Sequence, residues 1–85
     1  MARTIRSTGH VALCQAITET RKRSGLTQAG LAERLRCHQS LVARIESGER
    51  RIDVVEMVVL ARAIGVPAQV LLQAAEAETA VDHRI

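Results

Sequence analysis

Apolar residues recur every three or four positions through residues 28–48, QAGLAERLRCHQSLVARIESG, and this helical spacing constrains the fold more than any other feature. The spacing is interrupted at Arg36-Cys37-His38, which predicts two short helices joined by a turn. Gln39, Ser40 and Arg44 fall on the exposed face of the second helix. A buried frame beside a polar edge of this kind is typical of helices that bind DNA.

Three further segments have helical periodicity, and each is bounded by residues that favour a helix end. His10–Arg23 is followed by Ser24-Gly25, Asp53 is an N-cap for Val54–Ile64, and Pro67 opens a last helix that carries Val70, Leu71 and Leu72. Thr27 is the predicted N-cap of the second helix. On the first four predicted helices, the residues expected to face inward are Leu13, Ile17, Leu31, Ala32, Leu35, Val42, Ile45, Val54, Met57, Val58, Ala61 and Ile64.

No segment alternates as a strand would, so we predict an all-α domain of five helices. With 85 residues, the chain has room for one hydrophobic core. We expect a flexible basic arm at residues 1–9 and the helical domain at 10–75. Residues 76–85 keep helix propensity without a strong apolar face, which predicts a C-terminal tail or a helical extension.

Charge and composition favour duplex DNA as a partner. The chain has no Phe, Tyr or Trp, and therefore lacks the stacking platforms that grip single strands or unpaired RNA bases. Its net charge is +3, but residues 1–51 carry ten basic and four acidic side chains, whereas residues 52–85 carry two and five. A polyanion would meet the first part of the chain. Charge alone fits an ordinary solvated surface equally well.

The sequence gives no indication of a metal site, a cofactor or a catalytic set. Cys14 and Cys37 are far apart and belong to no zinc-ligand pattern, and His10, His38 and His83 fall on separate segments. No apolar run has the length of a membrane span or follows the polar N-terminus as a signal peptide would. We therefore expect a reduced cytoplasmic protein that is not an enzyme and does not bind membranes.

Several short motifs, in order, resemble the Cro and phage-repressor type of helix-turn-helix domain, the XRE-like family of bacterial regulators. Each motif is weak alone, but their order and spacing make the match specific. The resemblance implies the phage-repressor-like fold, with the second and third helices as the helix-turn-helix and residues 39–47 as the recognition helix in the major groove. The matching residues are Arg21, GLTQ at 25–28, LA at 31–32, Leu35, Ser40, Val42, IESG at 45–48, LARAIGV at 60–66 and LL at 71–72.

The resemblance also implies roles for individual residues. Arg21 and Glu46 would form an ion pair that anchors the recognition helix. Leu41 borders the core, where packing is favoured over contact with a thymine methyl group. The residues that would read bases are Gln39, Ser40, Ala43 and Arg44. The residues that would contact the DNA backbone are Gln28, His38, Ser47, Arg50 and Arg51, and Arg3 and Arg6 of the arm could enter a minor groove.

Three residues depart from the family pattern. Arg36 occupies a turn position where the family usually has Gly, so the backbone must adopt a left-handed conformation there or change its path. His38 replaces the usual Ser or Thr cap of the third helix, and Gly30 weakens the second helix.

A second surface is predicted on the fourth and fifth helices. Val55, Val59 and Val70 stand where relatives commonly carry polar residues. We expect a two-fold homodimer through these residues and Ala74, on a DNA inverted repeat with half-sites roughly 34 Å apart. The alternative is that the valines pack beneath the C-terminal tail of the same chain.

These features predict a small transcriptional regulator that binds double-stranded DNA at specific sequences. A stand-alone repressor, a restriction-modification controller and an antitoxin with a toxin partner all fit this design. The rival is a protein-interaction module that uses the same fold and has lost DNA binding.

Overall fold

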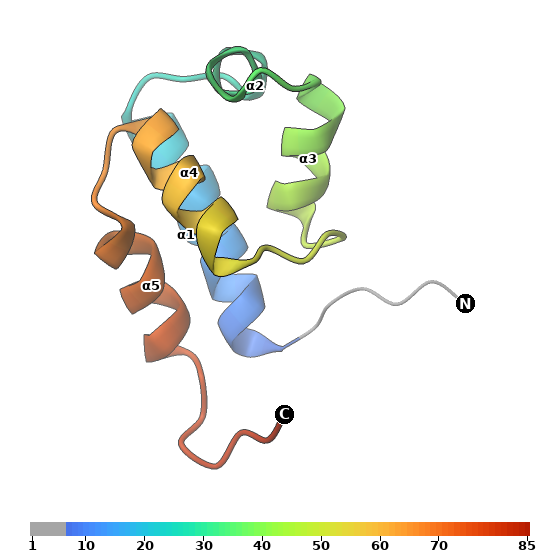
Figure 1. The fold of residues 1–85 in the computed structure, drawn as a ribbon. Helices are drawn as coiled ribbons and strands as arrows, with labels where there is room; N and C mark the ends of the chain where they lie inside the picture. The colour runs from blue at the N-terminus through green and yellow to red at the C-terminus, as the bar shows by residue number, and fades with distance from the viewer. Residues whose placement is uncertain (1–6) are drawn as a thin grey trace.

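The computed structural model describes residues 7–85, which form five α-helices and no strand (Figure 1). The predicted all-α, five-helix fold is confirmed. Residues 1–6, which include Arg3 and Arg6 of the predicted arm, lie outside the described residues. The helices are α1 (Thr8–Arg23), α2 (Gln28–Leu35), α3 (Gln39–Ser47), α4 (Val54–Ile64) and α5 (Ala68–Ala77).

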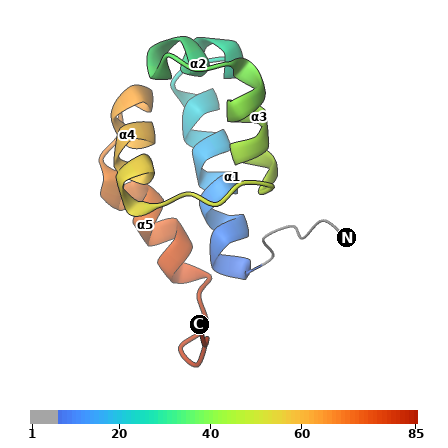
Figure 2. The same cartoon turned by 45° about the vertical axis from the view of Figure 1, so that its right-hand side comes forward.

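The longest helix, α1, runs through the middle of the molecule. In both views α2 lies across one end of α1 and α3 stands on one side with α5 on the other; α4 lies in front of α1 in Figure 1 and on the α5 side of it in Figure 2. The most extensive pairings are α1 with α5 and α2 with α3. The helix-turn-helix formed by α2 and α3 is thus supported by a frame of α1, α4 and α5.

Capping residues explain most of the helix boundaries. Thr27 accepts a hydrogen bond from the Gly30 amide at 2.9 Å, and Asp53 and Glu56 form a reciprocal capping box at the start of α4. The limits of α2, α3 and α4 match the predicted ones, although α3 begins without a side-chain cap.

The first and last helices differ from prediction. The Ser7 hydroxyl accepts from the His10 amide, so α1 begins at Thr8 and takes in two residues assigned to the arm. Pro67 is the N-cap of α5 rather than its first residue, and α5 ends at Ala77, so residues 78–85 do not extend it.

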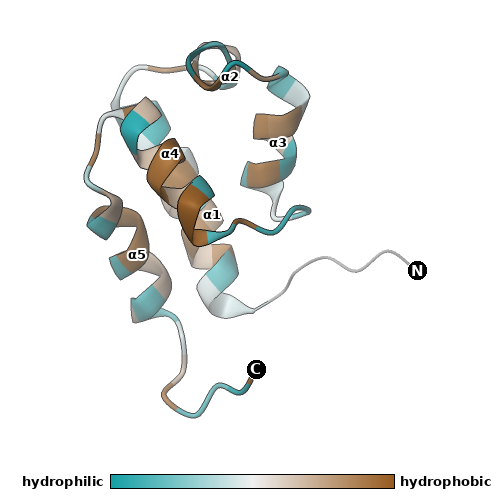
Figure 3. Cartoon of the chain, viewed as in Figure 1, coloured by the Kyte–Doolittle hydropathy of each residue, from teal (hydrophilic) through white to brown (hydrophobic). Residues whose placement is uncertain are grey.

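The core is aliphatic and draws on all five helices (Figure 3). Its fully buried side chains are Ile17, Leu31, Val42 and Leu71. The prediction that Val54 is buried is wrong, since it is 72% exposed. The inward face of α4 is set instead by Met57, Leu60, Ala61 and Ile64, and Leu60, absent from the predicted core, is only 2% exposed. Val54 precedes this stripe at the helix start, where no facing helix covers it.

No helix within residues 7–85 combines the length and apolar character needed to cross a lipid bilayer.

The beginning of α1 and the end of α5 approach closely at Gly9. A Cβ atom on Gly9 would collide with Thr79 Oγ1 and would lie 3.2 Å from the Ala75 carbonyl oxygen. The Thr8 hydroxyl donates to the Glu78 carbonyl at 2.6 Å across the same junction. A glycine at this point therefore allows the two helices to pack at backbone distance.

We predict that Gly9→Ala lowers the free energy of unfolding by about 1 kcal/mol. The new methyl group overpacks the junction by a cost of roughly 1–3 kcal/mol, which exceeds the 0.5–1 kcal/mol gain of Ala over Gly inside a helix. Denaturant unfolding measures the change. Adding Thr79→Ala removes the nearest obstructing atom and should recover much of the loss. A single variant more stable than the wild type would show that the junction is looser than described.

Candidate nucleic-acid interface

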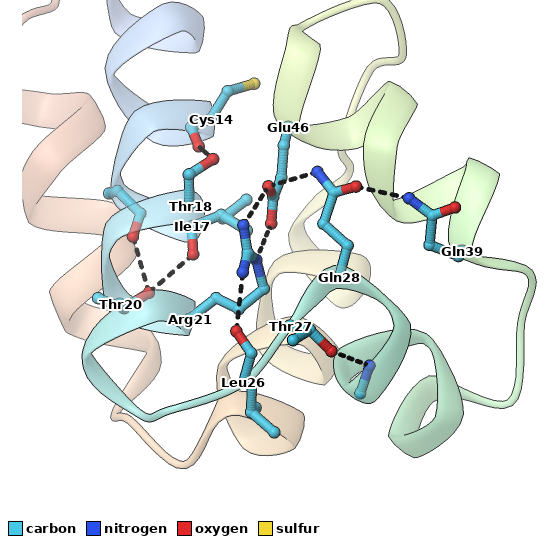
Figure 4. Close-up of polar contacts among 12 residues, drawn as sticks. Cys14, Ile17, Thr18, Thr20, Arg21, Leu26, Thr27, Gln28, Gln39 and Glu46 are labelled. Atoms are coloured by element: carbon cyan, nitrogen blue, oxygen red, sulfur yellow. Dashed lines mark hydrogen bonds and ion pairs between the residues drawn. The ribbon is translucent and has the colours of Figure 1, made fainter.

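An ion pair joins the end of α1 to the end of α3. Arg21 Nε donates to Glu46 Oε2 at 2.6 Å, and Arg21 Nη2 donates to Glu46 Oε1 at 3.0 Å (Figure 4). The two side chains are only 8% and 5% exposed. Arg21 Nη1 also donates to the Leu26 carbonyl at 2.7 Å, which ties the α1–α2 connection to the same group. This bidentate geometry fixes α3 against α1.

The pKa of Glu46 reflects its surroundings. Burial by itself would raise the pKa of this carboxyl, but hydrogen bonds from Arg21 and Gln28 and the charge of Arg21 outweigh burial and leave the pKa below its ordinary value. The hydrogen bonds to Glu46 and the charge of that carboxylate raise the pKa of Arg21. Both groups are therefore charged in the folded protein at neutral pH.

The network continues from Glu46 to the start of α3, where the predicted base-reading residue Gln39 lies. Gln28 Nε2 donates to Glu46 Oε1 at 3.0 Å, and Gln28 Oε1 accepts from Gln39 Nε2 at 2.7 Å (Figure 4). A carboxylate only accepts hydrogen bonds, so the amide nitrogen of Gln28 must face Glu46 and its oxygen must face Gln39. Gln39 is thereby oriented by a chain of contacts that begins at Arg21.

Sequence reasoning missed the Gln28–Gln39 contact. It assigned Gln28 to a DNA phosphate, yet both ends of this amide already have protein partners. One N–H of Gln28 stays available to an external acceptor. Two glutamines eleven residues apart give no pattern in a sequence, because the contact arises only when α2 and α3 cross.

The exposed face of α3 carries the predicted base-reading residues together. Gln39, Ser40 and Arg44 are exposed and Ala43 is half-buried, while Val42 and Ile45 are buried on the opposite side. Leu41 packs against the core. Ala32, 3% exposed on α2, is small enough to let α2 and α3 cross closely. The face formed by the predicted base-reading residues Gln39, Ser40, Ala43 and Arg44 thus carries no large apolar side chain.

The turn before α3 has the two departures noted in the sequence. Arg36 adopts the left-handed conformation, with φ 58° and ψ 47°. The His38 side chain makes no capping hydrogen bond to α3 and is exposed.

The remaining residues predicted to contact the DNA backbone lie at the end of α3 and in the loop before α4, and their surroundings differ. Ser47 is exposed, and its single hydroxyl proton is within reach of two acceptors, the Arg44 carbonyl and the Glu49 carboxylate. Arg50 forms a bidentate pair with Glu56 at 2.6 and 3.1 Å, with both side chains about one-third exposed. Arg51 is exposed, and within residues 7–85 its guanidinium forms no hydrogen bond or ion pair. Arg51 is therefore freer than Arg50 to meet an external anion.

The described residues offer no metal centre. No group of three or more potential metal ligands occurs within residues 7–85. Cys14 is 3% exposed, and its Sγ lies 3.5 Å from His10 Nε2. Burial raises the pKa of the Cys14 thiol, so the thiolate is disfavoured at this position.

The predicted dimer residues lie on two different helices with different surroundings. Val55 and Val59 are 71% and 46% exposed and line a hollow of about 190 Å³ between α4 and the helix-turn-helix. The opposite wall of the hollow is formed by Leu35, Cys37, Leu41 and Ile45. On α5, Val70 is 39% exposed and Ala74 is half-buried.

Comparisons with known proteins agree with this geometry. Residues 12–75 match a protein family that is described as a helix-turn-helix domain. Among solved structures, an XRE-family like protein from Pseudomonas syringae pv. tomato str. DC3000 is similar, with a TM-score of 0.75 and 40% sequence identity. The similarity covers 85% of this chain and 88% of that one. A search of curated proteins found no match.

The Arg21–Glu46 pair makes stability depend on pH. Because the pKa of Glu46 is lowered on folding, its contribution is complete above the ordinary value of 4.5 and is lost as the pH falls through the folded value. We predict that Glu46→Gln destabilises the protein at pH 7 by roughly 3–5 kcal/mol, since it leaves Arg21 buried without a countercharge. Unfolding measured between pH 3 and pH 7 would show a shallower acid loss in the variant. An equal acid loss in both proteins would contradict the assignment.

Proposed function

Since the chain belongs to the XRE-like family of helix-turn-helix proteins, we propose that it is a small transcriptional regulator that binds double-stranded DNA at specific sequences. In this proposal α3 enters the major groove of the DNA. The protein acts in the cytoplasm. The observation that carries the proposal is the hydrogen-bonded chain from Arg21 through Glu46 and Gln28 to Gln39, which holds an exposed amide at the start of α3.

The side-chain amide of Gln39, held by Gln28, has the free donor and the free acceptor that an adenine edge requires. Gln39 uses one N–H on Gln28 and keeps its other N–H and its carbonyl oxygen. Adenine presents N7 as an acceptor and N6 as a donor, so one glutamine amide can satisfy both. Since Gln28 already orients this side chain, less conformational freedom is lost on binding.

The other residues on this face complete the proposed reading surface. Arg44 would make a bidentate contact with guanine O6 and N7, and Ser40 and Ala43 would contact neighbouring base edges. The spare N–H of Gln28, together with His38, Ser47 and Arg51, would contact phosphates and set the register. Arg50 would contribute less to phosphate binding, because Glu56 already neutralises it.

A homodimer would place two such surfaces on an inverted repeat, with half-sites roughly 34 Å apart. The exposure of Val55, Val59 and Val70 supports this part of the proposal, because three exposed β-branched side chains on neighbouring helices favour a protein partner. The hollow beside Val55 and Val59 also supports the second candidate, a protein-interaction module or an antitoxin in which this surface binds a different chain.

We predict salt-dependent binding to DNA fragments selected from the host genome. Phosphate contacts release counterions, so affinity should fall steeply between 50 and 200 mM salt. Arg44→Ala should weaken the selected site by roughly 1–3 kcal/mol and relax preference at one base pair, with little effect on non-specific DNA. Fluorescence anisotropy on selected and scrambled duplexes measures both effects.

Arg84→Ala is a matched control for the Arg44 variant, because Arg84 is an exposed arginine in the C-terminal tail, outside the helix-turn-helix. It removes the same charge and should leave base preference unchanged. Binding that ignores salt, or no binding to any fragment, would favour the interaction-module candidate. Unchanged preference in the Arg44 variant would overturn the assignment of that residue.

We predict that Val59→Glu yields a monomer in sedimentation experiments at concentrations where the wild type is a dimer, because a carboxylate would be buried in the apolar interface. Leu72→Glu is the control: Leu72 is 52% exposed, but on α5 it lies on the opposite flank from Val70. A wild type that sediments as a monomer at high concentration would refute the homodimer. If both variants lose the dimer, the proposed interface is wrong and the two chains meet through another face.

A further inference from the structure

Arg36 has a backbone conformation that its side chain disfavours. Among residues 7–85 it is the one non-glycine residue with a positive φ, at 58°. The other three positive-φ positions in this range are Gly25, Gly48 and Gly65, each at or just beyond a helix end. A Cβ atom in the left-handed region crowds the following carbonyl oxygen, so an arginine at this position costs stability that a glycine would not.

The left-handed turn closes α2 through backbone hydrogen bonds to the Ala32 and Glu33 carbonyls, but the Arg36 side chain itself gains no contact within the described part of the chain that offsets this cost. Arg36 is exposed, and its guanidinium forms no hydrogen bond or ion pair within residues 7–85. Three other arginines do have such partners. Arg34 donates to the Ala63 carbonyl at 2.9 Å, and Arg21 and Arg50 each pair with a glutamate. The charge of Arg36 is therefore available to a partner outside the chain.

The position of Arg36 places this charge beside the base-reading end of α3. It lies three residues before Gln39, so their Cα atoms are at most about 11 Å apart. The first turn of α3 contains no acidic residue, and His38 gives it no side-chain cap. The turn therefore carries a cation within about 11 Å, Cα to Cα, of Gln39 and next to a helix start without a side-chain cap, with no acidic residue between them in sequence.

We propose that Arg36 binds a DNA phosphate flanking the base pair that Gln39 reads. This inference rests on the proposed function, and it adds a backbone contact at a position where the family usually has glycine. Duplex DNA carries a dense row of phosphates along each groove edge, so a strand that meets the start of α3 also passes the preceding turn. The contact strengthens binding to all sequences alike, because phosphates carry no base information.

The proposal predicts opposite changes in stability and affinity for the same substitution. Arg36→Gly and Arg36→Asn both relieve the left-handed strain, since Gly and Asn adopt this conformation more readily than Arg. Each should raise the melting temperature by several degrees while lowering the affinity for selected and scrambled duplexes by roughly fivefold at 0.15 M salt. The slope of log affinity against log salt should decrease by about 0.9.

Two further variants separate charge from backbone effects. Arg36→Lys keeps the charge and the strain, so it should retain most of the salt slope and the wild-type melting temperature. Arg84→Gln removes one charge from the C-terminal tail and should leave the slope close to that of the wild type. These measurements use the full chain, with anisotropy for binding and calorimetry for melting.

The outcomes distinguish this inference from the function on which it rests. If Arg36→Gly binds both duplexes with wild-type affinity and slope, Arg36 makes no phosphate contact, whatever its melting temperature. If the loss is confined to the selected duplex, Arg36 reads a base and the phosphate assignment is wrong. If the wild type itself shows no salt-dependent DNA binding, the proposed function fails together with this contact.

Discussion

The ion pair between Arg21 and Glu46 is the contact on which the helix-turn-helix depends. It joins the end of α1 to the end of α3, and it lies almost entirely out of water. An exposed pair of this kind would contribute little, but a buried pair leaves an uncompensated charge if either partner is lost. Hydrogen bonds to Gln28 and Leu26 occupy further donors and acceptors of the two groups. The body of the protein and its proposed reading surface are therefore mechanically linked through one buried charge pair.

The frame around this pair is built from helices that are distant in sequence. The beginning of α1 packs against the end of α5 at Gly9, and α2 reaches α4 through Arg34 and the Ala63 carbonyl. The core has no aromatic side chain to fill the space between helices. The helices instead approach each other closely at small residues such as Gly9 and Ala32. This arrangement explains how α2 can tolerate Gly30 and α3 can form without a side-chain cap. Tertiary packing holds both helices where their local sequence is weak.

Local signals in the sequence were sufficient for the fold class and for most helix limits. Thr27, Asp53 and the glycines at 48 and 65 act through neighbouring backbone groups, so their effect can be read without knowing the fold. The periodicity of apolar residues did not predict the buried face of α4 correctly, because Val54 is exposed and Leu60 is buried. In an almost wholly apolar helix several faces look equally hydrophobic, and the facing helices decide which one is buried. The start of α1 was also misplaced, because the cap at Ser7 lies in a stretch with no apolar pattern.

By itself, the sequence determined that the chain forms five helices, where α2 and α3 begin and end, and which polar residues share one face of α3. It also determined that residue 36 would be strained if the turn kept its usual path, because that cost depends on one side chain and its own backbone. The tertiary structure alone decided that Gln28 faces Glu46 and Gln39, that Arg50 is held by Glu56 while Arg51 has no partner among residues 7–85, and that Val55 and Val59 border a hollow. These facts depend on the angles at which helices cross, and such angles are set by packing over the whole core rather than by any local pattern.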